Sequence, residues 1–338
     1  MTAPEPRANP LLFGHAAAEA AMAEAIRSGR MHHAWLITGP DGIGKATLAY
    51  RFARRLLAGH GAGEGLALDP GSPAFRRVAA GSHADLLTIE LVFDEKRKRM
   101  KSQIAVDDIR KINGFLSLTP AEGGWRVVIV DGAEDLNQSS ANALLKVLEE
   151  PPPRAVLLLV CAAPGRLPPT IRSRCRRLKL DPLAGADMDA LLARFLPETE
   201  EDERGRLAAL AEGSPGRALA LAEDEGLQIA ALVDGVLSAL PDLPTLKAYD
   251  IADALGRGEE AFSTFMDLLR SALAAAVRDV VRGQADAEQS RLVASRPLER
   301  WVEIFQELGR LQSETERFAL DRRQAVVAGL GALAAGAH

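Results

Sequence analysis

An α/β domain, with a parallel sheet covered by helices on both faces and followed by helical domains, is the fold class that the sequence predicts. Short apolar runs alternate with amphipathic helical patterns from residue 9 to about residue 182, which is typical of βαβ units. A glycine-rich segment joins the first apolar run to the next helical pattern. After Pro182 the strand pattern stops and helical patterns continue. A chain of 338 residues is long enough for two or three domains.

Five short apolar runs are predicted to be the strands of the sheet: Ala34–Thr38, Asp85–Leu91, Arg126–Val130, Ala155–Cys161 and Arg177–Leu180. Several of them are apolar on both faces, as expected when helices cover both sides of a parallel sheet. Three segments between the strands have the length and periodicity of amphipathic helices, namely Ala46–Ala58, Val106–Leu118 and Gln138–Glu150.

Two segments interrupt this alternation. Residues Gly59–Gly81 are rich in glycine, which predicts a loop or a short irregular helix. The charged run Asp94–Lys101 follows a strand and predicts the tip of a hairpin. A solvated tip and a phosphate-contacting tip both fit this run, and the solvated interpretation is preferred.

The sequence after Pro182 predicts a small helical lid and then a larger helical domain. Short helical patterns surround the turn GSPG at residues 213–216, and longer patterns follow, such as Ala261–Arg282 and Leu298–Gln312. We therefore divide the chain into an α/β domain (1–182), a lid (183–226) and a C-terminal helical domain (227–338).

Charge and composition exclude several classes of protein. The formal net charge is −5, so any contact with DNA is expected to be local. No apolar run reaches the roughly 18 residues of a membrane helix, and the N-terminus is polar and proline-rich, so we expect a soluble, cytoplasmic protein with no membrane partner. Cys161 and Cys175 are too few for a disulfide framework or a four-cysteine zinc site, and reduced thiols are expected.

A phosphate-binding loop is predicted at residues 39–45, GPDGIGK, because this run follows an apolar strand and precedes a helix. Gly39, Gly42 and Gly44 allow successive backbone N–H groups to turn toward phosphate oxygens. Lys45 adds a full positive charge at the helix N-terminus. A nucleotide is the expected ligand, and a turn that merely joins strand to helix is the weaker alternative.

One magnesium ligand is missing from this loop. The residue after the lysine is normally Ser or Thr, whose hydroxyl binds the ion, but here it is Ala46. Thr47 comes next, and successive helical side chains are about 100° apart, so Thr47 is expected to point elsewhere. The sequence permits nucleotide binding but predicts that magnesium is poorly held.

A second part of the site is predicted at the end of another strand. Asp131 follows the buried run VVIV at residues 127–130. The carboxyl ends of parallel strands are where α/β sheets bind their ligands. An acidic group is therefore expected near the phosphate loop.

Two longer motifs resemble the clamp-loader subunits of the AAA+ ATPases. SANALLKVLEEPP at 140–152 and LPPTIRSRC at 167–175 carry the resemblance, and the Ser-Arg-Cys triplet at 173–175 is typical of that family. LFGH at 12–15 is similar to the family's segment beside the adenine, and GSPGR at 213–217 is similar to its lid arginine motif. The resemblance implies an AAA+ domain, a helical lid and a C-terminal collar domain that packs with related subunits.

Against that family pattern, two further chemical groups are missing. AAA+ ATPases usually have a water-polarising Glu after the strand-end acid, where this chain has Gly132. They also present a polar sensor after the strand that ends here in Cys161, where Ala162 and another alanine follow. Glu134 is an alternative source of the missing carboxylate, although errors of about 1 Å in position can cost roughly 100-fold in rate. The resemblance therefore implies a retained fold with little or no ATP hydrolysis.

The resemblance also gives roles to basic residues. Arg174, in the Ser-Arg-Cys triplet, is expected to act in trans as an arginine finger on a neighbouring subunit's ATP, because a guanidinium is always charged and planar. An ordinary surface salt bridge is the alternative. Arg217 would reach from the lid toward the phosphates, or only stabilise a turn if no nucleotide is bound. Lys146 lines a DNA-facing surface or is simply the polar side of its helix.

The implied function is that of a delta prime type of clamp-loader subunit in the bacterial DNA polymerase III holoenzyme. Such a subunit helps gamma/tau and delta subunits to load the sliding clamp onto primed DNA. ATP would be bound weakly or not at all. Many relatives carry four cysteines for zinc, but Gly59–Gly81 has none, so no zinc is expected. Two alternatives stay open: an active ATPase of the gamma/tau type, and a non-catalytic AAA+ adaptor in another pathway such as DNA repair.

Overall fold

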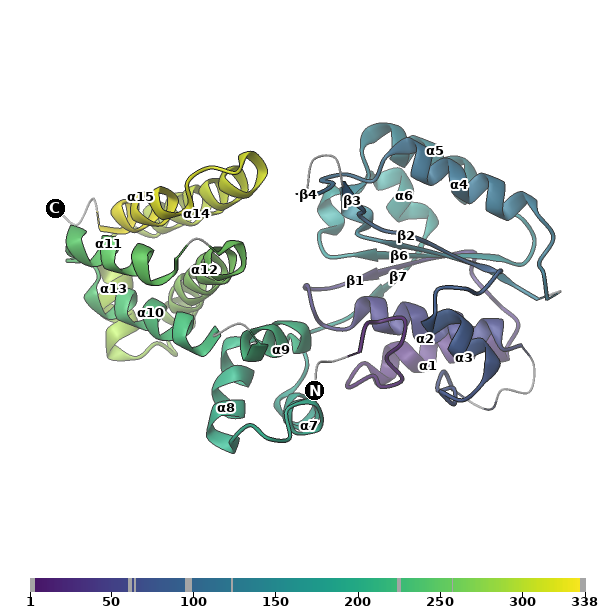
Figure 1. Ribbon diagram of the computed structural model, residues 1–338, viewed down its shortest axis with the longest axis horizontal. Helices are drawn as coiled ribbons and strands as arrows, with labels where there is room; N and C mark the ends of the chain where they lie inside the picture. The colour runs from purple at the N-terminus through teal and green to yellow at the C-terminus, as the bar shows by residue number, and fades with distance from the viewer. Residues whose placement is uncertain are drawn as a thin grey trace. The chain divides into compact units, whose positions relative to one another are not determined.

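The computed structural model describes residues 4–59, 63, 65–94, 99–122, 124–223, 226–256 and 258–334. The chain forms two compact units, Met1–Leu219 and Ala220–His338. Figure 1 labels their helices and strands.

A five-stranded parallel sheet is the centre of the first unit, with the strand order β2-β5-β6-β1-β7. Its strands are β1 (Ala34–Thr38), β2 (Leu86–Ile89), β5 (Arg126–Asp131), β6 (Ala155–Cys161) and β7 (Arg176–Lys179). The predicted parallel sheet is confirmed. The second strand is shorter than predicted, since Asp85 and Glu90–Leu91 lie outside the paired residues.

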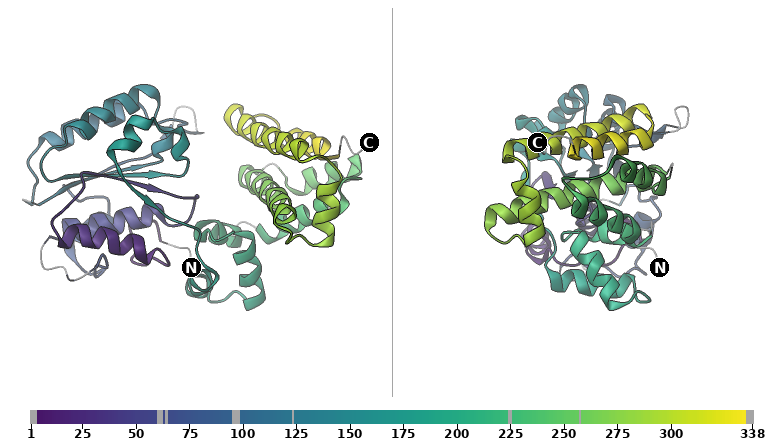
Figure 2. Two further views of the ribbon diagram at one scale, coloured as in Figure 1. Left: turned by 180° about the vertical axis from the view of Figure 1, so that it is seen from behind. Right: turned by 90° about the vertical axis from the view of Figure 1, so that its left-hand side faces the viewer.

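Helices cover both faces of this sheet (Figures 1 and 2). On one face lie α4 (Val106–Ser117), α5 (Gln138–Glu149) and α6 (Pro169–Arg174); on the other lie α1 (Ala16–Arg27), α2 (Lys45–Leu57) and α3 (Pro73–Ala79). Because successive strand residues point to opposite faces, Ala34 and Leu36 belong to the core under α4 to α6. Trp35 and Ile37 belong to the core under α1 and α2.

Both interrupting segments contain some regular structure. Helix α3 follows Ser72, whose hydroxyl accepts a hydrogen bond from the Phe75 N–H, and it begins with Pro73, a favourable first helical residue. Strand β3 (Phe93–Asp94) pairs antiparallel with β4 (Arg99–Met100). The predicted hairpin is present, and its tip, residues 95–98, lies outside the described residues.

Three helices follow the last strand of the sheet: α7 (Gly185–Phe195), α8 (Glu201–Leu210) and α9 (Pro215–Glu223). The first unit ends within α9, at Leu219. Two short 3-10 turns, η1 (Ala133–Asp135) and η2 (Pro164–Arg166), follow β5 and β6. We use the term lid for α7 to α9.

The second unit has only α-helices as regular secondary structure in its described residues. It contains α10 (Gly226–Ala239), α11 (Thr245–Ala254), α12 (Glu259–Arg282), α13 (Ala287–Ala294), α14 (Leu298–Phe318) and α15 (Arg322–Ala334). Helix α12 contacts α10, α13 and α14, and α15 packs against α11 and α14. Phe265 and Leu269 of α12 and Ile304 and Leu308 of α14 are buried. No helix in the described ranges of the chain is long and apolar enough to cross a membrane.

Candidate functional site

The phosphate loop, residues 39–45, lies at the carboxyl end of β1, which is flanked in the sheet by β6 and β7. The loop leads directly into α2, so the N–H groups of the first helical turn face it. Gly42 and Gly44 have φ values of 72° and 99°, a region that side chains other than glycine rarely adopt. The loop therefore has the backbone shape that anion binding requires.

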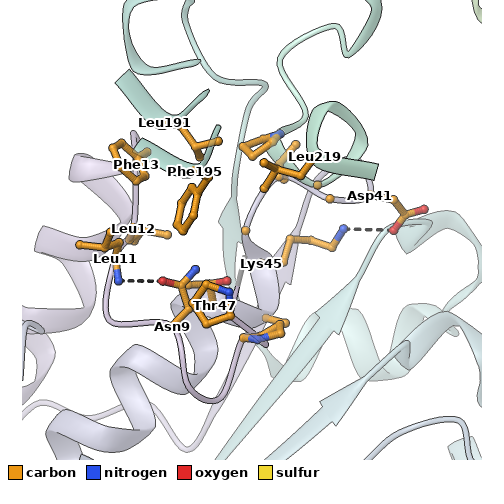
Figure 3. Close-up of a pocket in the computed structure, with 18 of the residues that line it drawn as sticks. Asn9, Leu11, Leu12, Phe13, Asp41, Lys45, Thr47, Leu191, Phe195 and Leu219 are labelled. Carbon is orange, nitrogen blue, oxygen red and sulfur yellow. Dashed lines mark hydrogen bonds and ion pairs between the residues drawn. The ribbon is translucent and has the colours of Figure 1, made fainter. Parts of the chain in front are cut away.

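Lys45 is buried and holds the loop from inside (Figure 3). Its Nζ donates to the carbonyl oxygens of Gly39 and Pro40, at 2.8 and 2.7 Å. A third contact, 3.4 Å long, reaches the carboxylate of Asp41. That carboxylate is 92% exposed, so water weakens the ion pair. The ammonium group thus stabilises the curved loop through backbone carbonyls.

A pocket of about 300 Å³ lies next to the loop. Its apolar walls come from the N-terminal segment and from the lid, and Figure 3 shows the two sets facing each other. They include Leu11, Leu12 and Phe13 on one side and Leu191, Phe195 and Leu219 on the other. The rings of Phe13 and Phe195 meet edge to face, with centroids 6.3 Å apart. An apolar slot beside a phosphate loop has the chemistry that the base of a nucleotide requires.

Two arginines of α2 fasten the N-terminal segment beside this pocket. Arg54 is only 1% exposed, and its two terminal nitrogens donate to the carbonyls of Arg7 and Asn9, at 2.9 and 2.7 Å. Its guanidinium also lies over the Phe75 ring, 4.4 Å from the centroid. Arg51 donates to the carbonyl of Pro10, at 2.5 Å. The helix that starts at the phosphate loop therefore also positions the segment that forms the pocket wall.

The residues at the loop do not fit a magnesium ion. Ala46 lines the pocket but has no oxygen to offer. Thr47 also lines the pocket, and Figure 3 places it beside Asn9, whereas the Lys45 side chain extends toward Asp41. The Thr47 hydroxyl therefore does not replace the missing hydroxyl at position 46.

Asp131 ends β5 and also lines the pocket. Burial raises the pKa of its carboxyl to about 6, the charge of Glu90 adds to this effect, and Lys45 opposes it. Asp131 is therefore a partly desolvated carboxyl group at the pocket, close enough to Glu90 and Lys45 for both charges to act on it.

Glu134 is hydrogen-bonded to the backbone just after the neighbouring strand, β6. Its Oε1 accepts a hydrogen bond from the Ala162 N–H at 2.8 Å. The thiol of Cys161 lies near the same carboxylate; burial first, and then the charge of Glu134, raises the pKa of this thiol to about 12. Sequence reasoning had considered Glu134 only as a substitute base and missed this contact, which joins η1 to the end of β6.

The lid touches the phosphate loop directly. The Ser214 hydroxyl donates to the carbonyl of Asp41 and the Gly216 N–H donates to the carbonyl of Gly42, both at 2.8 Å. A Cβ on Gly42 would lie 2.5 Å from the Ser214 Oγ. The sequence had singled out Arg217, which lies 3.8 Å from the Glu212 carboxylate in a partly exposed ion pair. The sequence did not indicate that Ser214 and Gly216, close to Arg217 in the chain, bind the loop.

Arg174 does not line the pocket. It ends α6, where its Nη1 donates to the Thr170 carbonyl at 3.0 Å and its Nη2 lies 2.8 Å from the Glu149 carboxylate. The structure thus separates Arg174 from the phosphate-loop residues of its own chain. Lys146, on α5, is exposed.

Comparison with known proteins decides the family. A family model described as "DNA polymerase III, delta subunit" matches residues 14–184, which is half of the chain. The chain belongs to this family.

Individual relatives agree with this assignment. The DNA polymerase III subunit delta' of Pseudomonas aeruginosa is 41% identical over 211 residues, 62% of this chain and 61% of that protein. The subunit delta' of Escherichia coli is 36% identical over 60% of this chain and 58% of its own length. The tau subunit of Escherichia coli is 33% identical, over 66% of this chain and 34% of its own. The alignments thus span less than two thirds of these relatives.

Among solved structures, a DNA polymerase III gamma subunit-related protein of Thermotoga maritima is similar over 94% of this chain and 100% of its own, with 18% identity and a TM-score of 0.48. The sheet covered by helices on both faces and the all-helical second unit confirm the fold class that the sequence predicted.

Within this family fold, the sequence-predicted residues fall into two places. Gly42, Gly44, Lys45, Ala46, Thr47 and Asp131 all line the one pocket described above. Gly39 lies at the start of the same loop, and a Cβ there would lie 2.4 Å from the Leu180 carbonyl oxygen. Arg217 is not among the lining residues of this pocket, and Arg174 lies elsewhere, at the end of α6. In the described part of the chain, no group of three or more His, Cys, Asp or Glu side chains could hold a metal ion.

Proposed function

We propose that this chain is a clamp-loader subunit of the delta prime type, which helps load the sliding clamp onto primed DNA and supplies Arg174 to the ATP site of a neighbouring subunit. Its partners in this role are gamma/tau-type and delta-type subunits of DNA polymerase III. Membership of the polymerase III delta family and relatives named delta' support the proposal.

One observation carries the non-hydrolysing part of this proposal. The phosphate loop keeps its shape and its lysine, whereas Ala46, Gly132 and Ala162 stand at the three positions that would hold magnesium, activate water and sense the phosphate. Glu134, the nearest substitute for the carboxylate, is bonded to the Ala162 N–H. In this account the pocket holds a nucleotide statically or weakly, without a reaction.

Contacts between the lid and the loop support a static role. The Ser214 hydroxyl and the Gly216 N–H donate hydrogen bonds directly to carbonyl groups of the phosphate loop. In a motor subunit, bound nucleotide would have to move the lid and the sheet relative to each other. Here a direct bond already joins the lid to the loop, which favours a rigid element over a moving one.

The place of Arg174 supports its action in trans. The side chain lies outside its own pocket and is 36% exposed, so its guanidinium can reach a phosphate on another subunit. A guanidinium that enters a water-poor ATP site stabilises the charge that develops on the transferred phosphoryl group.

The division into residues 1–182, 183–226 and 227–338, with the last part as a collar between subunits, remains part of this proposal. Large apolar side chains are exposed on α11 and α14, and such side chains can pack against a partner. They are Leu246, Tyr249, Leu298, Val302 and Phe318.

The ATPase rate of the assembled complex tests this proposal. Arg174→Ala should lower turnover at the one ATP site that it serves by about 10³-fold or more, and so depress the ATPase rate of the complex, while leaving assembly intact. Arg177→Ala is the matched control, since Arg177 is an exposed arginine three residues away on the edge strand β7. An Arg174→Ala complex with the rate of the Arg177→Ala complex would refute the arginine-finger assignment.

A further inference from the structure

Arg174 is held by a carboxylate from a different helix. Glu149 is the last residue of α5, and its Oε1 lies 2.8 Å from the Nη2 of Arg174. The carbonyl of Thr170, four residues earlier in α6, accepts from Nη1. The guanidinium thus contacts the end of α5 and the backbone of its own helix, α6.

Three other cations between residues 166 and 179 are held differently. Lys179 pairs with Asp181, two residues away on the same stretch of chain. Arg166 lies 3.8 Å from its acidic partner Asp135. Arg176 lies over the Trp35 ring, 4.6 Å from its centroid. Among these residues, only Arg174 combines a short ion pair from a second helix with a bond to the backbone.

A contribution to folding stability does not explain the ion pair between Glu149 and Arg174. Both side chains are partly exposed, at 36% and 49%, and ion pairs at such positions contribute little to folding. The main consequence is conformational, because a long arginine side chain loses rotamer freedom when both terminal nitrogens are bound. A guanidinium has five N–H groups, and these two contacts use two of them. Three donors stay available for phosphate oxygens.

We propose that Glu149 is a positioning residue, which sets the orientation of Arg174 before a neighbouring subunit's ATP meets it. This inference rests on the proposed function, since it concerns the same arginine. A preorganised guanidinium reaches the transition state without first being ordered, whereas a mobile one must be ordered during the reaction. Glu149 touches neither ATP nor the reacting atoms in this account.

Glu149→Gln in the assembled complex tests the inference, with Glu150→Gln as the matched control. Glu150 is the adjacent exposed glutamate. The glutamine keeps the size of the side chain and removes its charge. We expect kcat for ATP to fall about three- to tenfold, less than the roughly 100-fold of a 1 Å displacement. The KM for ATP and the thermal midpoint should stay unchanged, because the arginine acts in the transition state. Glu150→Gln should leave kcat unchanged.

The double variant Glu149→Gln/Arg174→Ala separates this inference from the proposed function. If Glu149 acts through Arg174, the double variant should be no slower than Arg174→Ala alone. An unchanged or raised kcat in Glu149→Gln, a further loss in the double variant, or loss of assembly would overturn the positioning role while leaving the finger intact. No effect of Arg174→Ala would instead refute the proposed function itself.

Discussion

Gly216 of the lid lies directly against Gly42 of the phosphate loop. The Gly216 N–H donates to the Gly42 carbonyl at 2.8 Å, and a Cβ built on Gly216 would lie only 2.9 Å from the Gly42 Cα. Two glycines are needed for so close an approach of two backbones. The lid is therefore joined to the loop by direct main-chain contact.

Gly216→Ala should separate the lid from the phosphate loop. The Cβ of the alanine would lie 2.9 and 3.1 Å from backbone atoms of Gly42. Backbone atoms cannot move aside as a side chain can, so we expect a loss of about 1–3 kcal/mol in the free energy of unfolding. Hydrogen exchange at the amide of residue 216, which donates to the Gly42 carbonyl, should become faster. Gly205→Ala is the control, since Gly205 lies inside α8 with open space around its Cα, and alanine there should be neutral or stabilising. Unchanged exchange in Gly216→Ala would contradict the direct contact.

Arg54→Lys should loosen the N-terminal segment. Lysine keeps the charge but cannot donate in a planar fork to the carbonyls of Arg7 and Asn9. We expect a loss of about 1–3 kcal/mol, together with faster proteolysis within residues 4–13 under limited trypsin or chymotrypsin treatment. Arg27→Lys, at an exposed arginine on α1, should change neither measurement. Equal stability of the two variants would show that Arg54 does not fasten this segment.

Asp131→Asn should stabilise the protein more at pH 8 than at pH 5. The folded-state pKa of Asp131 is raised to about 6 from 3.8. Its contribution to stability is thus complete below about 3.8 and is lost as the pH rises through 6. Removing the charge should therefore gain about 3 kcal/mol at pH 8 and about half as much at pH 5, where the carboxyl of the unfolded chain is already ionised. Thermal midpoints of both proteins at the two pH values measure the effect, and an equal gain at both values would contradict the raised pKa.

Ala46→Thr should make nucleotide binding depend on magnesium. The hydroxyl would stand where phosphate loops normally hold the ion, so ADP affinity should rise about five- to tenfold with MgCl2 and stay unchanged with EDTA. Ala46→Val is the control, because valine has the shape of threonine without the hydroxyl. Calorimetric titration of ADP compares the variants. A gain that is the same for valine would mean that shape, and not a magnesium ligand, is responsible.

Local features of the sequence were sufficient for the sheet and the loop. The strand 155–161 is apolar at every position, and the glycines of 39–45 are typical of a turn before a helix. Patterns within a few residues were therefore enough to predict both. The strand ends shifted by one or two residues, because pairing with the neighbouring strand decides where a strand stops.

Contacts between distant residues could not be predicted in this way. Ser214 is 173 residues from Asp41, and Glu134 is 28 residues from Ala162. A serine in a turn and a glutamate after a strand fit many roles, and only the folded chain chooses among them. The partner of Arg174 illustrates the same point: the sequence indicated the arginine, whereas the packing of α5 against α6 revealed Glu149.

The central claim is that this chain has kept the fold of an ATP site but does not hydrolyse ATP. Measuring ATP turnover by the purified chain alone tests this claim most directly. With ATP and magnesium but no partner subunits, we predict no release of phosphate above the background of a Lys45→Ala preparation. Turnover at about one ATP per second, an ordinary enzymatic rate, would contradict the account and favour an active ATPase of the gamma/tau type.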